Sequence, residues 1–290
     1  MPAQGEALLT WALWAVAVAV VVSTYSRVPP EETYHVSRDG LAGGLSRAVT
    51  VTNFPIALVA VALALIAMCV LPRRAWLVAA PALALCATIP LFNDQANLDA
   101  HRGNALPAVG VLLALVLTVA AARRAGAGLT PTRPWDRWRV VVAIVVGLVS
   151  LPWITAELGF HFPGDFFMGE EPGEEKDGTS IAAVHLGHHH GTDGALLVLG
   201  VLLLSRVGVA TRGMRVAVFA VLGALLAYGG TNLAQDVWNE QMVERGWTER
   251  GIPSVILPAA EPIWLLVVGL AVLATVVLLR EDKGSSYSVP

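Results

Sequence analysis

Charged residues are scarce in this chain of 290 residues: they make up 14% of it, while apolar residues make up 56% and the mean hydropathy is +0.65. A soluble domain typically carries about 25% charged residues. The shortage of charge therefore excludes an ordinary soluble domain and indicates a membrane protein. The apolar residues lie in continuous runs rather than in short alternating ones, which favours membrane-spanning helices over a barrel of strands.

Cysteine and the common catalytic motifs are also nearly absent. The two cysteines, Cys69 and Cys86, lie inside apolar runs, where we interpret them as packing residues, so a disulfide framework is excluded. The sequence contains no HExxH, GxSxG or P-loop motif. Repeats and long hydrophilic segments are missing as well, and we expect residues 1–290 to form a single transmembrane domain.

Apolar runs of about 18 to 23 residues, the length that crosses roughly 30 Å of hydrocarbon, recur along the whole chain. They predict an all-α polytopic membrane protein with about eight transmembrane helices. The predicted spans are Glu6–Tyr25, Val49–Leu71, Ala75–Phe92, Ala105–Ala122, Trp138–Glu157, Gly194–Ala210, Met214–Val237 and Glu261–Leu279. An even number of crossings places both termini on the same side of the membrane.

Basic residues are divided unequally between the two sides of this topology. Twelve of the 19 Lys and Arg residues fall on the side that holds both termini. The positive-inside rule makes this side cytoplasmic and predicts a multi-pass protein of the cell membrane. Most carboxylates fall on the opposite, extracytoplasmic side, whose negative charge attracts cations and excludes nucleic acid as a partner.

All seven histidines lie on the predicted extracytoplasmic side. Four of them stand in "HLGHHHG", where His188 and His189 follow His185 by three and four residues and share a face with it if the segment is helical. Imidazoles so placed suit a metal ion, and we predict His185, His188 and His189 as ligands, with His161 as a further one. The alternative is a solvated loop that protonates near pH 6.

Carboxylates are predicted at the same level of the membrane. Glu157 ends the fifth predicted helix, Asp236 lies at the outer end of the seventh, about one turn inside the membrane interface, and Asp94 follows the third. An ionisable group at this depth is costly unless it is paired, solvated or ligating, so it is a functional candidate. We predict these three as catalytic residues, with Glu157 or Asp236 as general base; a local structural role is the alternative.

Three prolines lie in the outer thirds of their predicted helices, at Pro55, Pro90 and Pro152. Each removes a backbone hydrogen bond and favours a kink. Splayed helix ends would open a cavity toward the outer leaflet, whereas the alternative is that these prolines only mark helix ends.

The first long loop, "YSRVPPEETYHVSRDGLAGGLSR", holds Arg27, Arg38 and Arg47 on the side that disfavours basic residues. Arginines kept there suit an anionic group such as a phosphate or a lipid head. We predict an anion-binding role for them, with simple solvation as the alternative.

Imidazole and carboxylate without cysteine favour zinc, with copper or iron as alternatives. A bound zinc would lower the pKa of a water toward neutrality. We therefore expect a metal-dependent enzyme, a zinc-dependent membrane hydrolase, that acts on a lipid or lipid-linked substrate at the extracytoplasmic interface. The alternatives are a transporter or metal-handling protein and a pH-sensing or structural subunit. Small residues such as Gly223 and Gly229 serve packing within a chain or between chains, so the oligomeric state stays open.

Overall fold

The computed structural model describes residues 3–33, 36–51, 53–92, 99–160, 184, 186, 190–209, 212–256 and 260–285. The chain is 76% helical, and the described residues contain no strand. The prediction of an all-α protein is therefore confirmed.

Ten α-helices follow one another along the described chain. They are α1 (Gly5–Tyr25), α2 (Gly40–Val51), α3 (Asn53–Met68), α4 (Trp76–Cys86), α5 (Ala105–Ala125), α6 (Asp136–Val149), α7 (Leu151–Glu157), α8 (His190–Leu204), α9 (Arg212–Trp238) and α10 (Pro262–Ser285). Short 3-10 turns at Pro30–Glu32, Arg73–Ala75, Ile89–Leu91 and Arg102–Asn104 accompany them, and a π-helix, Asn239–Val243, continues α9.

Each predicted apolar run falls on a helix, but fewer than eight pass as complete membrane spans. Among the described residues, five helical stretches are long and apolar enough to cross a membrane, or up to seven if each bent helix pair is one span. The apolar helix α8 has 15 residues and a length of about 22 Å, below the roughly 30 Å of the hydrocarbon core. A multi-pass membrane protein is thus supported, whereas the count of eight is not confirmed.

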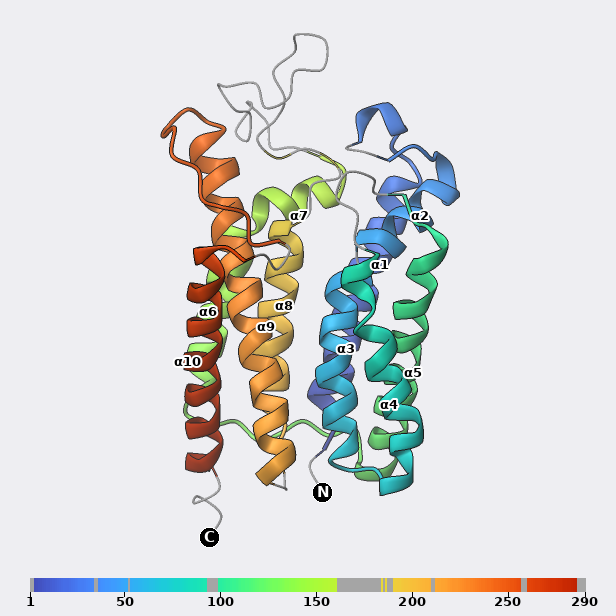
Figure 1. The fold of residues 1–290 in the computed structure, drawn as a ribbon, viewed down its shortest axis with the longest axis vertical. Helices are drawn as coiled ribbons and strands as arrows, with labels where there is room; N and C mark the ends of the chain where they lie inside the picture. Colours follow the sequence, from blue (N-terminus) through green and yellow to red (C-terminus); the bar gives the residue numbers. More distant parts are fainter. Residues whose placement is uncertain are drawn as a thin grey trace.

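The helices run up and down along one long axis (Figure 1). The start of α1 and the end of α10 lie at one end of the bundle, which we call the proximal end. The opposite end, which holds α2, α7 and the end of α9, is the distal end. The assignment of the proximal end to the cytoplasm stays a prediction.

Two apolar cores hold the bundle together. The larger lies between α1, α3, α8 and α9 and includes Trp14, Leu63, Leu197 and Leu222. The second lies between α3, α4 and α5, where small side chains such as Ala60 let the helices approach closely.

Glycines set the closest helix crossings in this chain. A Cβ on Gly229 would lie 2.9 Å from the carbonyl oxygen of Gly194 in α8, and a Cβ on Gly223 would lie 2.8 Å from that of Ala271 in α10. Both predicted packing glycines therefore serve contacts within one chain.

A sharp bend separates α6 from α7. The two helix axes differ by 61°, and Pro152 stands at the beginning of α7. Because proline cannot donate the backbone hydrogen bond that would continue α6, a change of direction is favoured there. The bend turns α7 across the distal end of the bundle, where Glu157 is its last residue.

Ion pairs close the proximal end. Arg139 of α6 donates to Asp136 at 3.2 Å and to Glu281 of α10 at 2.6 Å, while Arg206 pairs with Asp136 at 3.2 Å. The Ser205 hydroxyl accepts a further hydrogen bond from Arg139 Nε at 3.1 Å. These contacts tie together α6, α10 and the segment that follows α8.

Candidate functional site

Four carboxyl side chains from four successive helical elements gather at the distal end. Glu157 ends α7, Asp193 lies in the first turn of α8, Asp236 lies near the end of α9, and Glu240 belongs to the π-helix. Glu157, Asp236 and Glu240 are buried, and electrostatic interactions link Asp193 to Glu157 and Asp236, and Asp236 to Glu240. We call these four residues the acidic cluster.

The glycines of "HGTDG" bring α8 into this cluster. Gly191 packs flat against Trp153 of α7, where a Cβ would clash with the indole ring. A Cβ on Gly194 would lie 2.7 Å from the carbonyl oxygen of Gly229 in α9. The backbone N–H of Gly191 donates to the Asp236 carboxylate. The start of α8 is thereby pressed between α7 and α9, which places Asp193 among the other carboxyls.

The π-helix holds Glu240 against α7. Its carboxylate accepts a 2.6 Å hydrogen bond from Trp153 Nε1. Asn239 exchanges two hydrogen bonds with Ile252, with Nδ2 donating at 3.1 Å and Oδ1 accepting at 2.9 Å. These two hydrogen bonds hold the segment that follows the π-helix against the π-helix itself. Such local departures from α-helical geometry are frequent at functional sites.

One guanidinium faces this acidic cluster. Arg47 of α2 is fully buried and lies over the Tyr25 ring, with 5.2 Å between the guanidinium carbon and the ring centroid. Its positive charge acts on the carboxylates of Glu157 and Asp193. Because carboxyls outnumber the guanidinium, the cluster would carry an excess of negative charge if every member were ionised. Proton binding or a cation is the physical remedy for such an excess.

Glu157 is 4% exposed, and its carboxyl is contacted by Tyr25, whose side chain donates a hydrogen bond to it, and by the positive charge of Arg47. The buried Oδ2 of Asp236 has no hydrogen-bond partner among the described residues. A buried polar atom without a partner is uncommon and calls for an explanation, such as a catalytic role.

A cavity of about 170 Å³ opens beside Glu157 between α1, α7 and α8. Its polar lining consists of Glu157, Asp193 and Thr192, and the Thr192 hydroxyl is buried without a hydrogen-bond partner. The other lining residues are apolar and include Val16, which is 63% exposed on the outer surface of α1. The cavity therefore reaches the carboxyls from the side of the bundle that faces lipid.

Beyond the π-helix, Glu244 has an altered pKa. Partial burial and the neighbouring Glu240 carboxylate raise the pKa of Glu244 from its ordinary value of 4.5 to about 8. The negative field of the acidic cluster thus extends to the end of this helix.

Some of the predicted site residues lie in the acidic cluster, and the others lie outside the residues that the structure describes. Glu157 and Asp236 lie in the acidic cluster. Asp94, His161, His185, His188 and His189 lie outside the described residues. Within the described part, no group of three or more His, Cys, Asp or Glu side chains is placed to hold a metal ion. The zinc site remains a prediction, and we derive no chemistry from it.

The three predicted anion-binding arginines have different surroundings. Arg47 is buried beside the acidic cluster. Arg38 lies 4.0 Å from Asp99, and Arg27 donates to the backbone oxygen of Ser23 at 3.0 Å. Anion binding by these residues stays a prediction.

Sequence reasoning left out Asp193 and Trp153. Asp193 carries a recognisable signal, since it is a lone acid between two glycines at the start of an apolar run. Trp153 was not predicted as a site residue, because a tryptophan near the end of a membrane helix ordinarily lies at the membrane–water interface.

Comparison with known protein families, with curated proteins and with solved structures finds no match to this chain. Its function is therefore argued from the site alone.

Proposed function

We propose that this protein is a membrane enzyme that acts on a lipid or lipid-linked substrate, which reaches Glu157 through the cavity between α1, α7 and α8. One observation carries the proposal: the buried carboxyl of Glu157 lines a mostly apolar cavity that opens on the lipid side of the bundle. Such a carboxyl is free to exchange a proton with a substrate or a water that enters.

The residues around Glu157 suit hydrolysis of an ester bond. In this role the Glu157 carboxylate removes a proton from the attacking water. The proton held on Glu157 is then given to the departing alcohol oxygen, so the carbonyl carbon gains the water oxygen, loses the alcohol, and the Glu157 carboxylate is restored. The Arg47 guanidinium places a positive charge near that carboxylate, and Asp193 is the second carboxyl at the cavity. The apolar lining suits an acyl chain.

The distribution of charge along the helices supports a one-sided site over a transport path. No Asp, Glu, Lys, Arg or His occurs at positions 7–24 in α1, 194–205 across α8, or 216–235 in α9. Polar routes through transporters need such groups or broken helices near the midplane. The acidic cluster is therefore separated from the proximal ion pairs by an apolar layer.

An activity assay tests the proposal. Wild-type protein in liposomes of phosphatidylglycerol and phosphatidylethanolamine is expected to release fatty acid, measured by mass spectrometry. Glu157→Gln is expected to lower the rate at least about 100-fold, because glutamine cannot accept the proton. Glu261→Gln is the matched control, since Glu261 is an exposed carboxyl at the same end of the bundle, and it should keep the wild-type rate. Equal rates in wild type and Glu157→Gln would contradict the proposal, as would a wild type that releases nothing.

The predicted zinc has a separate test. Elemental analysis of untagged protein, prepared without chelator, is compared with the double variant His185→Ala/His189→Ala. Near-stoichiometric zinc in the wild type and its loss in the variant would support the histidine ligands. Absence of metal from both would remove zinc from the proposal and leave the carboxyl chemistry in place.

A further inference from the structure

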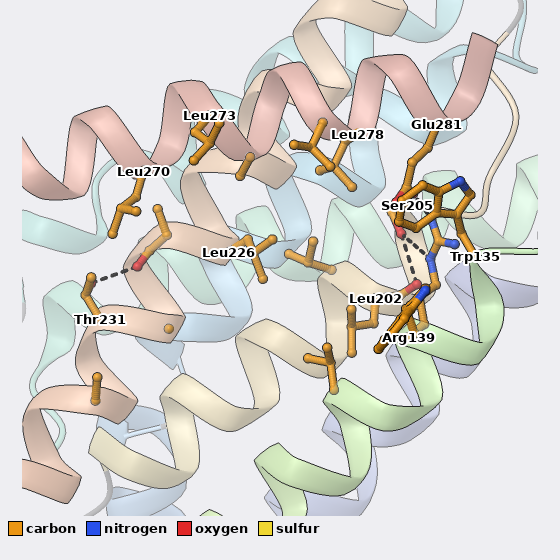
Figure 2. Close-up of a pocket in the computed structure, with 18 residues that line it drawn as sticks. Trp135, Arg139, Leu202, Ser205, Leu226, Thr231, Leu270, Leu273, Leu278 and Glu281 are labelled. Atoms are coloured by element: carbon orange, nitrogen blue, oxygen red, sulfur yellow. Dashed lines mark hydrogen bonds and ion pairs between the residues drawn. The ribbon is translucent and has the colours of Figure 1, made fainter. Parts of the chain in front are cut away.

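A second, larger cavity has other lining residues than the cavity beside Glu157. Helix α6 packs against α8 while α10 packs against α9, and a groove of about 570 Å³ remains between α6 and α10. Figure 2 shows α10 as one wall of this groove, with Leu270 and Leu273 pointing into it. We call it the α6–α10 groove. Its volume is that of a typical small-molecule site, about 300 to 1,000 Å³.

Small side chains create the groove. Ala227, Gly230 and Ala234 of α9 and Ala274 of α10 line it. A Cβ placed on Gly230 would meet no atom within 4 Å, so this part of α9 faces open space. Leucine and valine side chains supply most of the remaining surface. The groove therefore fits a flexible apolar chain.

One end of the groove is polar. Trp135, Arg139, Ser205 and Glu281 gather there, whereas Leu270 and Thr231 lie toward the other end (Figure 2). Arg139 uses three N–H groups on Asp136, Ser205 and Glu281, and a guanidinium has five. Trp135 is 51% exposed, and tryptophan favours the depth of lipid headgroups.

The dimensions match one leaflet of a membrane. From Leu270 to Glu281, α10 rises about 17 Å, close to the roughly 15 Å that half a hydrocarbon core occupies. The polar end lies at the proximal end of the bundle, where α10 finishes. Basic residues outnumber acids in the segments that meet there: Arg133, Arg137, Arg139, Arg206, Arg280 and Lys283 stand against Asp136, Glu281 and Asp282.

We propose that the α6–α10 groove binds one anionic glycerophospholipid. Its acyl chain lies along the Gly230 face of α9, and its phosphate accepts hydrogen bonds from the remaining N–H groups of Arg139 and from the Trp135 indole. The excess of arginine selects an anionic headgroup over a zwitterionic one. The site is independent of the acidic cluster and of the enzyme proposal.

Native mass spectrometry tests the lipid site. Detergent-purified protein is incubated with equal amounts of phosphatidylglycerol and phosphatidylcholine, and the wild type is expected to retain one phosphatidylglycerol. Gly230→Phe fills the groove and should reduce retention about tenfold. Gly269→Phe is the matched control, because Gly269 is exposed on α10 with open space at its Cβ and does not line the groove. Equal retention by Gly230→Phe and Gly269→Phe would overturn the proposal.

A second variant examines the headgroup without filling the groove. Arg137→Gln/Arg280→Gln replaces two exposed arginines beside the polar end, so folding should be preserved. The preference for phosphatidylglycerol over phosphatidylcholine is expected to fall severalfold toward equality. A wild type that retains both lipids equally, or a double variant with an unchanged preference, would overturn the anionic assignment.

Discussion

Charged side chains at the two ends of the bundle are satisfied to different degrees. At the proximal end, Arg139 and Arg206 contact Asp136 and Glu281 directly, at 2.6 to 3.2 Å. At the distal end, four carboxyls gather, and Arg47 acts on two of them, Glu157 and Asp193. Both ends use the same residue types, but Asp136 and Glu281 each contact a guanidinium directly, whereas the distal carboxyls outnumber Arg47.

We interpret this difference as a structural role of the charged residues at the proximal end and a functional role of those at the distal end. Removing one partner of a close ion pair leaves an uncompensated charge, so the proximal pairs hold α6, α10 and the end of α8 together. Buried carboxyls that lie close to one another lower stability unless they bind a proton or a cation. Such groups persist where function requires them. Replacing a charged side chain at the proximal end should therefore lower the stability of the fold, whereas replacing a carboxyl of the acidic cluster should leave it unchanged or raise it.

Arg139→Gln should have the largest effect on stability. It breaks the contacts with Asp136 and Glu281 and leaves Glu281 without its guanidinium, while Asp136 keeps Arg206, at a cost of about 3 kcal/mol in the free energy of unfolding. Unfolding in detergent micelles, followed by circular dichroism, measures this cost. Arg137→Gln, an exposed neighbour, should change it by less than about 0.5 kcal/mol. Equal effects from the two variants would show that the proximal pairs are not structural.

Gly191→Ala should have the next largest effect, at the distal end. The new Cβ clashes with Trp153 and pushes α8 away from α7, which costs about 2 kcal/mol. The same unfolding measurement applies. Gly269→Ala serves as the control, because its Cβ meets open space and alanine favours a helix by up to about 1 kcal/mol. A Gly191→Ala variant as stable as this control would refute the close packing of α8 on α7.

A smaller effect is expected for Glu244, through pH. Because its pKa is raised from 4.5 to about 8 in the folded protein, the folded state holds the proton more tightly than the unfolded state does. The stability that this group contributes is fully present below pH 4.5 and is lost as pH rises through 8. Thermal unfolding at pH 5 and pH 9 should show a smaller pH dependence in Glu244→Gln than in wild type. The exposed Glu249→Gln should keep the wild-type dependence, and identical slopes in all three would contradict the raised pKa.

Much of the fold could be predicted from apolar run length alone. Runs such as that of α9 are long enough to dictate a helix whatever surrounds them, and each predicted run falls on a helix. The number of membrane spans was less predictable from the sequence, because α8 is short and α6 bends at Pro152 into α7. The length and composition of an apolar run do not determine how a bent helix pair is placed in a membrane.

The site was predictable only where one residue carried its own signal. Glu157 and Asp236 stood out as acids at the ends of apolar runs, and both lie in the acidic cluster. Asp193 joins them through the packing of Gly191 and Gly194, and contacts between helices that are distant in sequence leave no periodic pattern. The histidine ligands lie outside the described residues and stay predictions.

Comparing the melting temperatures of Glu157→Gln and Asp136→Asn tests the central claim most directly. Both substitutions remove one negative charge and nearly preserve side-chain shape, one at each end of the bundle. We predict that Asp136→Asn lowers the melting temperature, because it weakens the contacts with Arg139 and Arg206, whereas Glu157→Gln leaves it unchanged or raises it. If Glu157→Gln lowers the melting temperature as much as Asp136→Asn, the Glu157 carboxylate is a structural group and the distal end is not a site kept for function.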